Sequence, residues 1–174
     1  MGLIIPNVHV GNVYAPLIFL LGPIRGAPNW QDDAVEYILS RKPTLVVASP
    51  RRGTGDKIPK YNPINGNNNH FPRQRAWERY YLEIARKKGC GMFWLPGESE
   101  HNCDKSYGAM TRLELGQLMT SYKQDHSTRF CIGTDGKFSE FDTIAYDLSL
   151  DAPDKKIFST LEETCDEAMR IALS

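Results

Sequence analysis

The sequence lacks long apolar runs, and none approaches the roughly 18 consecutive apolar residues that mark a membrane-spanning helix. The first residues, MGLIIPNVHV, also lack the basic flank and long apolar core of a signal peptide. Cysteines are few, four in 174 residues, and they form no CxxC pair. We therefore expect a cytoplasmic protein with reduced thiols and no membrane partner.

An excess of one charge is also absent, because Lys and Arg together number 21 and Asp and Glu together also number 21. Proteins that coat nucleic acid usually carry a basic excess, so we expect no nucleic-acid partner. His101 and Cys103 are close in sequence, but no fuller metal-ligand pattern surrounds them. The GxGxxG, P-loop, HExxH and GxSxG motifs are missing as well. We expect neither a metal nor another cofactor.

Short apolar runs alternate with helical patterns along the chain. Buried strands are predicted at 17–21, 44–48, 90–95, 129–132 and 156–158, and helices at 30–40, 73–88, 109–122 and from 139 and 159 onward. Strands that alternate with helices form a parallel sheet covered on both faces. The sequence therefore predicts a single α/β domain over residues 1–174, with a flavodoxin-like doubly wound parallel sheet of about five strands.

Polar residues mark the predicted helix starts. Asn29 is placed to cap the helix that begins at Trp30. The segment 139–142 resembles a capping box, and Ser159 with the acidic pair at 162–163 is expected to start the last helix.

Polar segments follow the first three predicted strands. They are GPIRG (22–26), a Gly-, Pro- and Asn-rich loop from 50 to 72, and a polar loop from 96 to 107. The carboxyl ends of parallel strands meet at one edge of the sheet, where doubly wound proteins bind ligands. A loop as long as 50–72 is typical of functional or mobile segments. We expect the binding site at this edge.

GPIRG places two glycines around an arginine. Gly22 and Gly26 permit close approach of the backbone to a ligand, and Arg25 carries a planar set of donors suited to phosphate or sugar hydroxyls. A plain strand-to-helix turn with a solvated arginine is the alternative. Arg51, just after the second strand, is likewise either an anion ligand or solvated.

Two glutamates are candidates for chemistry. Glu114 has Met110 and Leu118 one helical turn away, so its carboxylate is expected to be partly buried, which requires a partner or a function. Gly116 beside it leaves room for a neighbouring backbone or a ligand. Glu78 lies in the preceding helix. The alternatives are a solvated helix face for Glu114 and an ion pair between Glu78 and a neighbouring Arg or Lys.

The order and spacing of these motifs resemble the nucleoside 2-deoxyribosyltransferase-like superfamily, which includes nucleotide N-glycosidases. The resemblance covers residues 17–133 and is carried by IFLLGPIRGAPNWQ (18–31), AWE (76–78), MFWLP (92–96) and RLELGQLM (112–119). It implies that Glu114 is the nucleophile and that Glu78 orients the base. Relatives in this family are usually homo-oligomers, so a homo-oligomer is expected.

The substrate pocket expected from the resemblance draws on three segments. Its residues are Gly22, Pro23, Ile24, Arg25, Gly26, Trp30, Arg51, Tyr107 and Gly108. Trp30 is expected to face the base, and the Ser106 and Tyr107 hydroxyls to add donors. Two positions depart from the family pattern: Gly108 replaces an Asp that contacts the sugar, and Gly89-Cys90 replaces Ala-Asp. Because a carboxylate at 108 would repel phosphate, its absence together with Arg25 predicts a 5′-phosphorylated substrate. The alternative is that Arg25 pairs with Glu78 or Glu114 instead.

The predicted activity is N-glycosyl transfer or hydrolysis on a nucleoside or a nucleoside 5′-monophosphate. A carboxylate that attacks C1′ forms a covalent glycosyl-enzyme, which a second base or water then resolves. The alternative is a non-catalytic nucleotide-binding or sensing module on the same fold.

Overall fold

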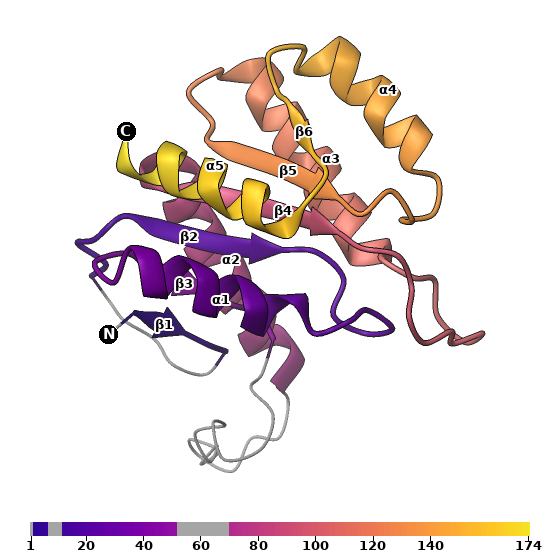
Figure 1. The fold of residues 1–174 in the computed structure, drawn as a ribbon, viewed down its shortest axis with the longest axis horizontal. Coiled ribbons are helices and arrows are strands. Elements are labelled where there is room, and N and C mark those ends of the chain that lie inside the picture. Colours follow the sequence, from indigo (N-terminus) through magenta and orange to yellow (C-terminus); the bar gives the residue numbers. More distant parts are fainter. Residues whose placement is uncertain (1, 7–11, 52–69) are drawn as a thin grey trace.

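Six parallel strands form one sheet in the part of the chain that the structure describes. The structure is a computed structural model and describes residues 2–6, 12–51 and 70–174. The strand order across the sheet is β1-β3-β2-β4-β5-β6, and every neighbouring pair is parallel (Figure 1). The strands are β1 (Leu3–Ile4), β2 (Leu17–Leu21), β3 (Val46–Ala48), β4 (Cys90–Leu95), β5 (Phe130–Thr134) and β6 (Ile157–Phe158).

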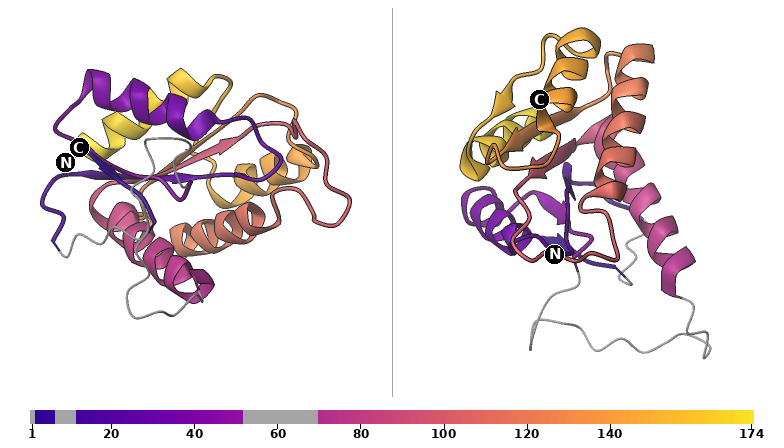
Figure 2. Two further views of the ribbon diagram at one scale, coloured as in Figure 1. Left: turned by 90° about the horizontal axis from the view of Figure 1, so that it is seen from below. Right: turned by 90° about the vertical axis from the view of Figure 1, so that its right-hand side faces the viewer.

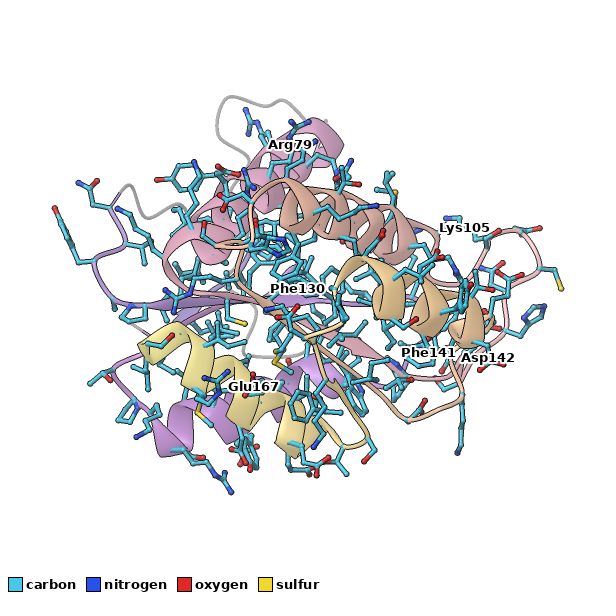
Figure 3. The ribbon with its side chains drawn as sticks, turned by 90° about the horizontal axis from the view of Figure 1, so that it is seen from above. Arg79, Lys105, Phe130, Phe141, Asp142 and Glu167 are labelled. Carbon is cyan, nitrogen blue, oxygen red and sulfur yellow. The ribbon has the colours of Figure 1, made fainter. Side chains whose placement is uncertain are left out.

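Helices cover both faces of this sheet. They are α1 (Trp30–Arg41), α2 (His70–Lys88), α3 (Ala109–Gln124), α4 (Phe141–Asp151) and α5 (Leu161–Leu173). Helices α1 and α5 pack side by side on one face, and α2 and α3 lie on the other (Figure 2). Arg79 on α2 and Glu167 on α5 mark the two outer layers, with Phe130 between them (Figure 3). This arrangement confirms the doubly wound α/β fold.

The central strands are apolar throughout because both of their faces are buried. In β2, Phe19 and Leu21 pack into the core under α2, α3 and α4, whereas Ile18 and Leu20 pack into the core under α1 and α5. Successive strand residues point to opposite faces, so a strand between two helical layers needs apolar residues at every position. The run LIFLL satisfies this requirement.

The observed elements differ from the predicted ones mainly at their ends. The additional strand β1 pairs with β3 at the edge of the sheet, and α2 begins at His70 rather than at 73. Among the described residues, no helix is both long enough and apolar enough to cross a bilayer.

Two predicted side-chain caps do not form, although Asn29 does occupy the predicted N-cap position of α1. The Asn29 side chain donates to the Asp32 carboxylate, at 2.7 Å, and makes no capping hydrogen bond to the start of α1. The Ser139 hydroxyl accepts a hydrogen bond from Arg112, at 2.7 Å, and α4 starts without a side-chain cap. In α5 the cap is Thr160, one residue after the predicted Ser159, and it accepts from the Glu163 amide at 3.2 Å.

Candidate functional site

A cleft of about 1320 Å³ lies at the carboxyl edge of the sheet. Its walls are the β2–α1 loop, the first residues after β3, the β4–α3 loop, and one side each of α2 and α3. The chain leaves β2 toward β3 on one side and returns to β4 on the other, so the cleft lies at the switch point of the sheet. In Figure 1 these loops extend beyond the arrowhead of β2, where the sequence predicted a site.

The structure brings together nearly all of the predicted site residues. The cleft is lined by Gly22, Pro23, Ile24, Arg25, Gly26, Arg51, Glu78, Tyr107, Gly108 and Glu114. Most of the predicted loop from 50 to 72 lies outside the described residues. Lys105 marks the far end of the β4–α3 loop, on the same side of the molecule as Phe141 and Asp142 at the start of α4 (Figure 3).

Glu114 and Glu78 are joined by one arginine at the floor of the cleft. Arg75 Nη1 donates to Glu114 Oε1 at 2.9 Å and also to Glu78 Oε2. Glu114 comes from α3, whereas Arg75 and Glu78 come from α2 and are three residues apart. The side chains of Glu114 and Glu78 are 15% and 13% exposed, so both carboxylates are largely withdrawn from water yet reach the cleft.

The two oxygens of Glu114 have different surroundings. Oε1 is held by Arg75, whereas Oε2 has no hydrogen-bond partner among the described residues and is not sealed from solvent. Burial raises the pKa of Glu114, the hydrogen bond from Arg75 lowers it, and the charge of Glu78 raises it, with a raised pKa as the net result. An oriented carboxylate with one open oxygen is suited to attack an electrophilic carbon.

Glu78 is engaged at both oxygens. Gln74 Nε2 donates to Oε1 at 3.0 Å, and Arg75 donates to Oε2. The ion pair with a neighbouring arginine, one of the two interpretations of Glu78, is therefore present. Direct contact between Glu78 and a substrate base would require one of these hydrogen bonds to break.

Trp30 does not line the cleft, contrary to the prediction. Its side chain is 3% exposed, and its indole Nε1 donates to the Pro23 carbonyl at 2.9 Å. Gln31 Nε2 donates to the same carbonyl at 3.1 Å, and its Oε1 accepts from Arg51 at 3.4 Å. Trp30 and Gln31 are buried in the first turn of α1, and their hydrogen bonds to the Pro23 carbonyl hold the β2–α1 loop in place. Gln31 was not predicted to support the site, because a single polar residue after Trp30 forms no distinctive pattern.

Packing of the protein on itself is sufficient to require glycine at positions 22 and 26. A Cβ on Gly22, whose φ is 152°, would lie 2.2 Å from the Trp94 carbonyl oxygen and 2.7 Å from the Trp30 ring. Gly26 has φ 74°, and a Cβ there would lie 2.8 Å from the Glu100 carbonyl oxygen. Its own carbonyl accepts hydrogen bonds from the amides of Ser99, at 2.7 Å, and Glu100, at 3.1 Å. These contacts join the β2–α1 and β4–α3 loops into one wall.

Arg25 and Arg51 supply positive charge to the same cleft. Arg25 is exposed, and neither a hydrogen bond nor an ion pair joins its side chain to another described residue. Arg51 is half-buried and oriented by Gln31. Both guanidinium groups are therefore available to an anionic ligand, whereas the charge of Arg75 is already opposed by two carboxylates.

Tyr107 and Gly108 shape the end of the β4–α3 loop. The Tyr107 hydroxyl donates to the carbonyls of Pro96 and Gly97, at 2.9 and 3.1 Å, so it is not the free donor that the sequence predicted. Burial raises the pKa of Tyr107, which keeps this hydroxyl protonated. Gly108 has φ 66°, and a Cβ there would lie 2.7 Å from the Phe138 ring. The fold therefore favours glycine at 108 and disfavours an aspartate.

No family model matches the chain, and no curated protein matches it in sequence. In the described ranges, no three His, Cys, Asp or Glu side chains lie close enough to hold a metal ion.

Proposed function

We propose that this protein cleaves or transfers the N-glycosidic bond of a nucleoside or nucleoside 5′-monophosphate, as a relative of the nucleoside 2-deoxyribosyltransferase-like superfamily. One observation carries the proposal: Glu114 lines the switch-point cleft with one carboxylate oxygen held by Arg75, while the other has no hydrogen-bond partner among the described residues and is not sealed from solvent. The order of the motifs from GPIRG to RLELGQLM supports the same superfamily.

The proposed reaction proceeds through an ester between Glu114 and the sugar. Glu114 Oε2 attacks C1′, the C1′–N bond breaks, and its electron pair leaves with the base, which takes up a proton from solvent that the second nucleophile returns in the next step. Water or the nitrogen of a second base then attacks C1′ and releases the carboxylate. In hydrolysis, water supplies the hydroxyl group to C1′ and the proton to the base, so the enzyme is unchanged after one turnover.

A panel assay tests this function. The protein is incubated with 2′-deoxynucleosides, ribonucleosides and their 5′-monophosphates, and free base is measured by chromatography while the intact protein is weighed by mass spectrometry. We expect release of base and a glycosyl adduct that maps to the peptide containing Glu114. Binding of a nucleotide without release of base from any member would instead favour the non-catalytic binding module.

Arg25→Ala is expected to erase a preference for the 5′-monophosphate over the nucleoside. Arg25 has no partner among the described residues, and a charge-assisted hydrogen bond contributes about 1.5–3 kcal/mol. The value of kcat/KM for the monophosphate should therefore fall about 10- to 100-fold, with little change for the nucleoside. Steady-state kinetics on the matched pair of substrates measures this effect.

Arg79→Ala is the matched control for Arg25→Ala, because Arg79 is an exposed arginine of α2 that does not line the cleft (Figure 3). It should leave the preference unchanged. If the wild type prefers the nucleoside, the phosphate prediction is wrong and the loop recognises sugar hydroxyls.

A further inference from the structure

We infer that Arg75 is a positioning residue for Glu114, and that Glu78 contributes by holding Arg75 rather than by contacting the substrate. This inference rests on the proposed role of Glu114 as the nucleophile. The deciding observation is that a single guanidinium nitrogen, Arg75 Nη1, lies between one carboxylate from α2 and one from α3.

The arrangement fixes the direction of Glu114. Glu78 and Arg75 are three residues apart on α2, so they share one face of that helix and hold each other in place. Arg75 also reaches α3, where it donates to Glu114 Oε1 at 2.9 Å and not to Oε2. Because the hydrogen bond fixes the position of Oε1, it also fixes the direction in which Oε2 points. Such preorientation is what a nucleophile needs, because a misplacement of about 1 Å lowers the rate on the order of a hundredfold.

Glu78 has the opposite pattern and therefore a different role. Gln74 donates to one of its oxygens and Arg75 to the other, and the side chain is only 13% exposed. A substrate base that bound Glu78 would have to displace one of these donors and leave it unpaired in a largely buried place, which is unfavourable. Glu78 is better placed as the anchor of Arg75 than as a ligand of the base.

The charges around Glu114 give this arrangement a measurable signature. From α2, Glu114 is faced by Arg75, which lowers its pKa, and by Glu78, which raises it. On its own helix, Arg112 is turned away to the carbonyls of Tyr107 and Ser139. The other charged or titratable groups that line the cleft form no hydrogen bond or ion pair with Glu114 among the described residues; they are Arg25, Arg51, Glu98, Glu100, His101, Cys103, Lys105 and Tyr107. Removal of Arg75 and removal of Glu78 should therefore move the pKa of Glu114 in opposite directions.

The experiment compares Arg75→Gln, Arg75→Lys and Glu78→Gln, with Arg79→Gln as the control on the same helix. The titration of Glu114 is followed by carboxyl ¹³C NMR, and kcat and KM are measured against pH. In Arg75→Gln we expect the titration and the acidic limb of kcat/KM to move to higher pH, and in Glu78→Gln to lower pH. We expect kcat of Arg75→Gln to fall about a hundredfold with little change in KM. Arg75→Lys should keep the titration near that of the wild type, because the charge is retained.

Unchanged titration of Glu114 in Arg75→Gln, with an active wild type, would overturn this inference alone. Equal loss in Arg75→Lys and Arg75→Gln, with the titration of Glu114 the same in both, would also overturn it, because that pattern indicates a purely structural arginine. A wild type that releases no base from any substrate would contradict the proposed function itself, and the inference would fall with it.

Discussion

Glu114→Gln is expected to lower kcat by about a thousandfold or more and to abolish the glycosyl adduct. The glutamine side chain keeps the shape of glutamate, and its amide oxygen can still accept the hydrogen bond that Arg75 makes to Oε1. The anion that attacks C1′ is lost, so chemistry should fail while binding of the substrate persists. Single-turnover release of base and intact-mass spectrometry measure the two effects separately.

Glu36→Gln is the control for this substitution. Glu36 is an exposed residue of α1, on the opposite face of the sheet from α3, and it does not line the cleft. It should turn over substrate like the wild type. If Glu114→Gln kept more than a small fraction of wild-type turnover, Glu114 would not be the nucleophile.

The raised pKa of Glu114 makes the proposed activity sensitive to acid. Glu114 must be ionised to attack, and burial raises its pKa above the ordinary value of a glutamate. Activity should therefore fall as the pH drops through this raised pKa, at a higher pH than for a solvated carboxylate. The acidic limb of the kcat/KM profile reports this value for the free enzyme.

The fold could be predicted because its central strands follow a strong rule. Strands β2 and β4 are buried on both faces, so their sequences are continuous apolar runs with little ambiguity. Strand β1, Leu3 and Ile4, was missed because it is short and no predicted helix separates it from β2, whereas the equally short β6 follows a predicted helix. Its existence depends on pairing with β3, which is information that only the folded chain contains.

Local caps were harder to predict because polar side chains have competing partners. Asn29 bonds to Asp32 and Ser139 accepts from Arg112, so neither serves the helix that follows it. Arg112 lies 27 residues before Ser139, so the sequence around Ser139 could not predict that contact. The location of a helix start is thus readable from the sequence, whereas the partner of its first polar residue is not.

The position of the candidate site could be predicted from the sequence, but the contacts between its side chains could not. Doubly wound topology brings the loops after β2, β3 and β4 to one edge, which is why residues from GPIRG, Arg51 and Gly108 meet. The pair Arg75–Glu114 spans 39 residues and two helices, so its existence follows from how α2 packs beside α3. The sequence predicted a close approach to a ligand at Gly22, and the structure shows a close approach there by Trp94 and Trp30.

That close approach makes Gly22→Ala the most disruptive single methyl addition that we expect in the cleft wall. Gly22 has φ 152°, and the added Cβ would lie 2.2 Å from the backbone oxygen of Trp94 and 2.7 Å from the buried Trp30 ring. Neither neighbour can move freely, because Trp94 belongs to central strand β4 and Trp30 is held by its hydrogen bond to Pro23. The free energy of unfolding should fall by about 3 kcal/mol or more.

Thermal unfolding measures this effect. Gly116→Ala is the control, because it makes the same glycine-to-alanine change at a position with free space. A loss of about 3 kcal/mol corresponds to a fall in Tm of roughly 6–12 °C for a chain of this size. Gly116 is an exposed residue inside α3, and a Cβ there meets nothing within 4 Å. Alanine at 116 should therefore raise stability by roughly 0.5–1 kcal/mol, because glycine weakens a helix interior. If both variants melted like the wild type, Gly22 would be free to serve a ligand, as the sequence first suggested, and the packing account of the loop would be wrong.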